Sequence, residues 1–269
     1  MAQEEFALEF IHNIRKQDRG LGGTKLWLMY KNHFKDNYMG RDRFASLIDR
    51  NHLKVRAKIR KPRTTDSSHG LPVYPNLVID LIPTRPNQLW VSDITYITIW
   101  KNSKDYTFCY LSLLQDAYTK EIIGWSVGST LDTIYPMQAL KMGLKRLDGK
   151  ENIDLIHHSD RGCQYASGEY INILKTHDIR ISMTESGNPH DNAMAERINN
   201  TIKNEFFKGI TFYNIDQVKN EVASAVDFYN NKRLHMSLNM MTPIQATHFV
   251  GEISYCWKSY RSIAIKKIR

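Results

Sequence analysis

Cysteines and long apolar stretches are both scarce in this chain. The three cysteines, Cys109, Cys163 and Cys256, form no CxxC pair, which excludes a disulfide framework and a zinc site built on cysteine. No apolar run reaches the ~18 residues of a membrane span, and the first residues carry acids where a secretory signal would carry bases. We therefore expect a protein of a reducing compartment, most simply the cytoplasm.

Internal repeats and low-complexity tracts are also missing, and no leucine heptads occur near the start. These absences exclude a solenoid and an N-terminal coiled coil. What the chain does have is 269 residues with 42% hydrophobic content, enough for one sizeable domain with smaller appendages.

The net charge of +9 is unevenly distributed along the chain. Residues 1–87 carry 16 bases and 9 acids, residues 88–212 carry 13 bases and 15 acids, and residues 213–269 carry 8 bases and 4 acids. Bases gathered for phosphates and acids gathered for metals would produce basic flanks around a slightly acidic middle. The distribution favours a polyanionic partner.

The first 53 residues have the spacing of three short helices joined by tight turns. The third, at 41–50, places Phe44 and Leu47 on one side and Arg41 and Arg43 elsewhere. This layout is typical of a helix-turn-helix module whose last helix contacts DNA, so Arg41 and Arg43 are candidate DNA contacts. A small basic helical cap is an equally good interpretation.

Residues 54–63 contain six bases in ten positions, and five prolines lie between residues 62 and 86. Such a stretch repels itself and resists a compact fold, which predicts a mostly extended linker over 54–87. Lys58, Arg60 and Lys61 are the candidates for tracking DNA phosphates along it. The alternative is a solvated tether that contacts no DNA.

From residue 88 the pattern changes to strands. Three β-rich runs with short turns predict an antiparallel meander, and the order βββαβαβ followed by helices predicts a mixed sheet with helices on its faces. The expected strands lie at 89–97, 106–117, 121–127, 153–157 and 179–183, and the expected helices at 133–147 and 168–177.

Asn188 and Pro189 are start signals for a long helix with an apolar stripe from Met194 to Phe206. Glu196 faces away from that stripe. It shares a polar side with Asn192, Asn199, Asn200 and Lys203.

Three acids are the candidates for chemistry: Asp93 inside the first strand, Asp160 after the fourth, and Glu196 on the long helix. Hard divalent cations need carboxylate oxygens that converge from separate elements. Each acid also has a plain alternative, since Asp93 could cap a sheet edge and Glu196 could be a solvated helix residue. Asp116 competes with Asp93, although a turn role fits Asp116 better.

Two histidines, His157 and His158, invite a metal interpretation. Adjacent strand residues point to opposite faces, so the pair cannot easily bind one ion. We interpret His158 as a hydrogen-bonding group that borders the site and His157 as a core residue.

Four motifs, in order, resemble the integrase core of bacterial insertion-sequence transposases of the OrfB type, relatives of retroviral integrases. They cover about 88–250, and the N-terminal helices are similar to the helix-turn-helix that precedes that core. The motifs are Trp90-Val91-Ser92-Asp93-Ile94-Thr95-Tyr96-Ile97, His158-Ser159-Asp160-Arg161-Gly162-Cys163-Gln164-Tyr165, Ser182-Met183 with Gly187-Asn188-Pro189-His190-Asp191-Asn192-Ala193 through Glu196, and Tyr229-Asn230 with Arg233, His235, Leu238 and Thr242-Pro243.

The resemblance implies an α/β, ribonuclease H-like fold with a five-stranded mixed sheet. It implies that Asp93, Asp160 and Glu196 bind two Mg²⁺ or Mn²⁺ ions, and that Lys203 contacts the DNA end. Asn192, on the same helix side, joins the DNA-contact candidates. The expected parts are a helix-turn-helix-like module (1–53), a linker (54–87), an integrase catalytic core (88–250) and a basic tail (251–269).

The implied activity is that of a DNA transposase, which nicks element ends and transfers the freed 3′-hydroxyl to target DNA. Its expected partners are double-stranded DNA carrying the terminal inverted repeats, target DNA, further copies of itself, and an upstream OrfA-type product, to which the family often fuses the chain. The expected location is the bacterial cytoplasm, at the nucleoid. A catalytically silent DNA-binding relic or inhibitor is the alternative. A metal nuclease of RNA–DNA hybrids is a third possibility.

Overall fold

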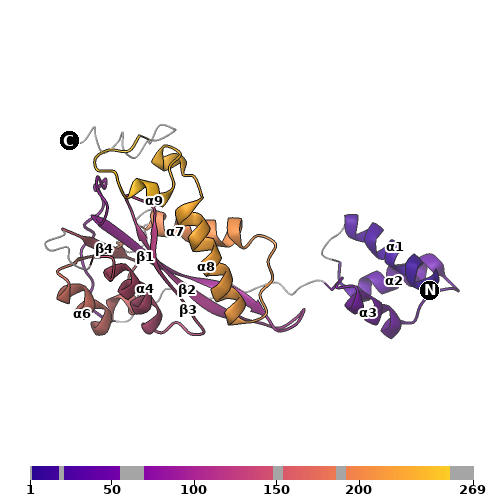
Figure 1. Cartoon of the computed structure of the whole chain (residues 1–269). Helices are drawn as coiled ribbons and strands as arrows, with labels where there is room; N and C mark the ends of the chain where they lie inside the picture. The colour runs from indigo at the N-terminus through magenta and orange to yellow at the C-terminus, as the bar shows by residue number, and fades with distance from the viewer. Residues whose placement is uncertain (1, 18–20, 55–69, 148–153, 186–191, 255–269) are drawn as a thin grey trace. The chain divides into compact units, whose positions relative to one another are not determined.

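The computed structural model describes residues 2–17, 21–54, 70–147, 154–185 and 192–254. The chain divides into two compact units, a helical one at the N-terminus and a larger one built on a sheet (Figure 1). No helix in these ranges is both long and apolar enough to cross a membrane.

The N-terminal unit contains the three predicted helices, α1 (Ala2–Gln17), α2 (Gly23–Phe34) and α3 (Arg41–Arg50). Each buries one apolar stripe against the other two, which is the packing that helical spacing of apolar residues predicts. The buried core consists of Ala7, Ile11, Leu26, Tyr30, Met39, Phe44, Leu47 and Ile48.

The larger unit is organised around a five-stranded mixed sheet in the order β3-β2-β1-β4-β5. β2 and β3 are antiparallel, whereas β4 is parallel to both β1 and β5. The predicted mixed sheet is therefore confirmed. The strands are β1 (Leu89–Trp100), β2 (Tyr106–Asp116), β3 (Ile122–Gly128), β4 (Ile156–Ser159) and β5 (Arg180–Met183).

Helices cover both faces of this sheet because strand residues alternate between two apolar clusters. Leu114 and Ile123 face α4 and α6, whereas Leu113 and Ile122 face α7 and α8 (Figure 1). The helices are α4 (Ile134–Leu144), α5 (Cys163–Ala166), α6 (Gly168–Thr176), α7 (Ala193–Thr201), the π-helical turn η1 (Ile202–Phe206), α8 (Ile215–Asn231), the 3₁₀ turn η2 (Met236–Leu238) and α9 (Pro243–Ala246).

The described part of the predicted linker, residues 70–87, lies in the larger unit rather than apart from it. The backbone N–H of Leu77 donates to Ser182 Oγ at 2.9 Å, and Val78 is buried against the sheet. Residues 70–87 have no helix or strand, as an extended segment should, yet they are docked along β5. Most of the predicted basic tail, residues 255–269, lies outside the described ranges.

Gly124 marks the closest approach between β3 and α4. A Cβ atom there would stand 2.0 Å from the carbonyl oxygen of Ala139. We expect Gly124→Ala to lower the free energy of unfolding by about 1–3 kcal/mol or more, because backbone cannot yield as a side chain can. The measurement is urea denaturation followed by circular dichroism. Gly168→Ala, with no atom within 4 Å of its Cβ, is the matched control and should leave stability almost unchanged.

Candidate active site

Asp93 and Asp160 are brought together by the parallel pairing of β1 with β4. The register pairs Leu89 with Ile156 and Val91 with His158. Asp93 and Asp160 each follow the last of these pairs by two residues, and the charge of Asp160 raises the pKa of Asp93, so the two carboxylates are close together. The two aspartates thus lie side by side where β4 ends.

The loop after β4 fixes the Asp160 carboxylate. The backbone N–H of Gly162 donates to Asp160 Oδ1 at 2.9 Å. A Cβ at residue 162 would stand 3.0 Å from that oxygen, so glycine leaves room for the close approach. The turn of the Asp-Arg-Gly motif therefore orients the carboxylate.

Helix α7 lies along β1, and three polar side chains, from its N-cap, from the helix itself and from the turn after it, bond to positions 92, 93 and 95 of that strand. Asn192 Nδ2 donates to the Ser92 carbonyl at 3.2 Å, and Asn199 Nδ2 donates to Asp93 Oδ2 at 2.7 Å. One turn further on, Lys203 Nζ lies 3.3 Å from Thr95 Oγ1 and 3.9 Å from the centroid of the Tyr96 ring.

Glu196 is carried on the same helix, one turn before Asn199, and its side chain is exposed. The structure thus confirms a polar helix side with Glu196 and Lys203 on it, but it also buries Asn192 and Asn199 against the strand.

The pKa of Asp93 is affected by both of the other carboxylates. Burial is the main cause that raises its pKa to about 7, and the charges of Asp160 and, less strongly, Glu196 add to the rise. The Ile94 backbone N–H and the Asn199 amide oppose it by donating to the carboxylate. Asp93 is therefore poised to take up a positive charge, as a proton or a cation.

Within the described residues, no three His, Cys, Asp or Glu side chains converge closely enough to hold a metal ion. Asp93 lies on β1 and Asp160 directly follows the neighbouring β4, while Glu196 projects from the helix. The predicted acids are thus neighbours that do not form a closed three-ligand cage.

Asn199 lies beside the acids, and the sequence pattern indicated no role for it. Its Oδ1 is buried and finds no donor among the described residues, while its Nδ2 binds Asp93. Spacing placed Asn199 on the polar side of the helix, three residues after Glu196, but could not reveal the bond to β1.

The paired histidines, His157 and His158, are both buried. His157 Nε2 bonds to the Tyr170 hydroxyl at 2.9 Å, and burial together with the neighbouring His158 lowers the pKa of His157 to about 3. His158 Nδ1 bonds to Ser182 Oγ at 2.8 Å. His157 is a neutral core residue, as predicted, and His158 is likewise buried.

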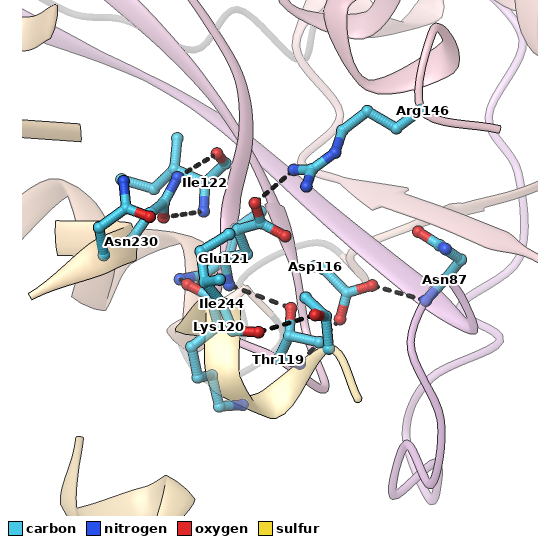
Figure 2. A network of polar contacts seen from close by, with 12 residues as sticks. Asn87, Asp116, Thr119, Lys120, Glu121, Ile122, Arg146, Asn230 and Ile244 are labelled. Atoms are coloured by element: carbon cyan, nitrogen blue, oxygen red, sulfur yellow. Dashed lines mark hydrogen bonds and ion pairs between the residues drawn. The ribbon is translucent and has the colours of Figure 1, made fainter. Parts of the chain in front are cut away.

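Asp116 has the turn role that its position predicted (Figure 2). Its carboxylate accepts from the backbone N–H groups of Asn87 at 2.6 Å, Tyr118 at 2.8 Å and Thr119 at 2.9 Å. These bonds occupy both oxygens, so Asp116 organises the turn between β2 and β3 and does not compete with Asp93.

The remaining DNA-contact candidates are scattered. Arg41 and Arg43 are exposed on α3, where they pair with Asp42 and Glu4, each at 3.2 Å. The stretch that contains Lys58, Arg60 and Lys61 lies outside the described residues, as do the expected helix-start residues Asn188 and Pro189.

The raised pKa of Asp93 has a consequence for stability. The folded protein holds the proton of the Asp93 carboxyl more tightly than the unfolded chain does, so the free energy of unfolding falls as pH rises from about 4 to about 7. We expect Asp93→Asn to stabilise the metal-free protein at pH 8 by roughly 1–3 kcal/mol and to have little effect near pH 4. Urea denaturation at both pH values, with exposed Asp80→Asn as the control, measures this. An equal effect at both pH values would contradict the assignment.

Comparison with known proteins agrees with this geometry. Residues 83–189 and 177–243 each match a family described as integrase core domain. A 31 kDa protein of insertion element IS600 from Shigella sonnei is 36% identical over 76% of this chain and 74% of its own length. A putative transposase for element IS986/IS6110 from Mycobacterium tuberculosis is 30% identical over 88% of this chain and 85% of its own length.

Among solved structures, the fold is similar to a chain of the simian T-cell lymphotropic virus intasome in complex with PP2A regulatory subunit B56 gamma. The TM-score is 0.52 at 14% identity, over 93% of this chain and 78% of that one. The intasome chain supports the fold, and the two insertion-element relatives support the family. The chain belongs to the insertion-sequence transposases with an integrase core domain, which are enzymes of the polynucleotidyl transferase type.

Proposed function

We propose that this transposase binds the ends of its own element, nicks a phosphodiester there and transfers the freed strand to target DNA, with Asp93, Asp160 and Glu196 as the catalytic acids. The observation that carries the proposal is the closeness of Asp93 on β1 to Asp160 just after the parallel β4, with the Glu196 helix bonded along β1.

The donor set fits hard divalent cations, and we propose two Mg²⁺ or Mn²⁺ ions held by these three acids. Carboxylate and amide oxygens are the ligands that such ions prefer. Asp93 is half-buried, and its pKa is raised by burial of the carboxyl and by two like charges, so it gains most from a nearby cation. The buried Asn199 Oδ1 is a further oxygen beside it. When bound, the ions polarise the phosphodiester and acidify the attacking hydroxyl group.

The protein's own residues would orient the reacting groups. Asn199 holds the Asp93 carboxylate, and the Gly162 N–H holds that of Asp160. Lys203 presents a positive charge beside Tyr96, two helical turns beyond Glu196, where it would bind a phosphate of the element's terminal DNA.

Two displacements at phosphorus account for the reaction. In the first, water attacks the phosphodiester at the element end, and the bond to the 3′-oxygen breaks to leave a 3′-hydroxyl. In the second, that hydroxyl attacks a target phosphodiester and expels a new 3′-oxygen. Each step breaks one P–O bond and forms another, so neither a covalent enzyme intermediate nor ATP is needed.

The basic flanks would recruit the DNA. We propose that the N-terminal unit and the segment with Lys58, Arg60 and Lys61 bind duplex phosphates, that several copies assemble on the DNA, and that an OrfA-type partner or fusion supplies recognition of the element end. A silent DNA-binding relic would share all of this except the nicking.

Removal of one acid separates the two functions. We expect Glu196→Gln and Asp160→Asn to bind an element-end duplex normally yet to lose nicking and strand transfer by more than the ~10–100-fold that changes around a metal site cost. The assay is gel analysis of labelled duplex in Mg²⁺ or Mn²⁺, with the chain alone and fused to its upstream product. Glu221→Gln, an exposed helix glutamate, is the control. Full activity in either acid variant would refute the catalytic assignment.

The role of Lys203 predicts a change in salt dependence. Lys203→Gln should lower the affinity for the element end and reduce the slope of log affinity against log salt by about one, whereas Lys203→Arg should retain most of both. Fluorescence anisotropy across a salt series measures the slope. Lys219→Gln, exposed on α8, serves as control, and equal slopes for Lys203→Gln and wild type would return Lys203 to a structural role.

A further inference from the structure

The helix that carries Glu196 does not end as an ordinary α-helix. After α7 the chain continues into the π-helical turn η1, where the N–H of Phe207 donates to the carbonyl of Ile202 at 3.0 Å, five residues back. Such a wide turn is rare and is usually found at functional sites. Lys203 lies within it, so the position of its ammonium group depends on how the turn is held.

The outer side of this turn is held by an arginine from beyond α8. Arg233 Nε lies 2.8 Å from Glu205 Oε1 and its NH2 nitrogen 2.9 Å from Oε2, a two-pronged pair between groups 28 residues apart. The pair lowers the pKa of Glu205 and raises that of Arg233. A planar fork fixes direction as well as distance, which a lysine in its place could not do.

Arg233 is itself set in a fixed position. Its guanidinium carbon lies 5.7 Å from the centroid of the Tyr229 ring, and its NH1 nitrogen lies 3.3 Å from His235 Nδ1. The Tyr229 hydroxyl accepts from Gln115 Nε2 of β2 at 3.1 Å.

The neighbouring Asn230 ties the same helix end to β3. Its side-chain amide bonds to both the N–H and the carbonyl of Ile122, each at 2.9 Å (Figure 2). These bonds fix the end of α8 to the sheet, so Arg233 connects η1 to a rigid base.

We infer that Arg233 is a positioning residue: its fork on Glu205 holds the π-helical turn and thereby sets Glu196 and Lys203 relative to Asp93 on β1. The inference rests on the proposed function, because Glu196 and Lys203 matter here as metal and DNA ligands. In the alternative role, Arg233 releases Glu205 and itself binds a DNA phosphate.

A double-mutant cycle on the full chain tests the inference. Arg233→Ala, Glu205→Ala and the double variant are compared by the Mn²⁺ concentration that gives half of the metal-dependent rise in Tm, each against its own metal-free baseline. Both single variants should need roughly tenfold more Mn²⁺, as outer-shell changes at metal sites do, and the double variant no more than either. The control is Arg180→Ala on β5, which removes an exposed ion pair with Asp154 and should match wild type.

Two readouts separate positioning from DNA contact. A positioning role predicts a loss in Arg233→Lys as large as that in Arg233→Ala, both for the Mn²⁺ midpoint and for the salt slope of DNA binding, because lysine cannot form the fork that holds the turn with Lys203. A phosphate contact predicts a slope lower by about one in Arg233→Ala, retained in Arg233→Lys, because lysine binds phosphate well as a point charge.

An unchanged Mn²⁺ midpoint in Arg233→Ala, or additive effects in the double variant, would overturn the inference. Failure of the proposed function is a different result: wild type would then show no Mn²⁺-dependent rise in Tm that Glu196→Gln removes, and the inference would fall with it.

Discussion

The parallel register of β1 and β4 is the constraint on which the site depends. It brings two carboxylates close together, Asp93 on the central strand β1 and Asp160 just after the neighbouring β4. Their repulsion and the loss of hydration raise the energy of the ionised pair, and hydrogen-bond donors from Ile94, Asn199 and Gly162 offset only part of that cost. The fold thus concentrates negative charge at one place. Hydrophobic packing on both faces of the sheet stabilises the strands that hold the two carboxylates there.

Helix α7 supplies the third carboxylate at less cost than Asp160 does, since the charge of Glu196 raises the pKa of Asp93 less strongly. Glu196 stays exposed, while the amides of Asn192 and Asn199, on the same helix, bond to β1 beside the aspartates. Uncharged amides can be buried against a strand far more cheaply than a third carboxylate could be. The helix is therefore anchored by neutral groups and presents its charged groups, Glu196 and Lys203, from the margin of the site.

Features set by local patterns could be predicted from the sequence, and features set by contacts between distant segments could not. Alternating and helical spacing predicted the mixed sheet, the three N-terminal helices and the turn role of Asp116. The docking of residues 70–87 along β5 was missed, because a proline-rich stretch with no periodicity carries no sign of its partner. The bond from Asn199 to Asp93 joins residues 106 positions apart and the Arg233–Glu205 fork joins residues 28 apart, so neither has a local signature.

The position of the site along the chain explains why the charge of the chain is uneven. Residues 88–212 contain the proposed catalytic acids and are slightly negative, so on their own they would repel a phosphate backbone. In the proposed function, affinity for DNA therefore comes from the basic flanks, where it would fall with salt and carry little sequence information. Even there the bases are partly neutralised, since Arg43 and Arg50 of α3 share one Glu4 oxygen at 3.2 Å each. A phosphate that bound this pair of arginines would have to displace Glu4, which would weaken the binding of a single N-terminal unit to DNA and favour binding by several units together.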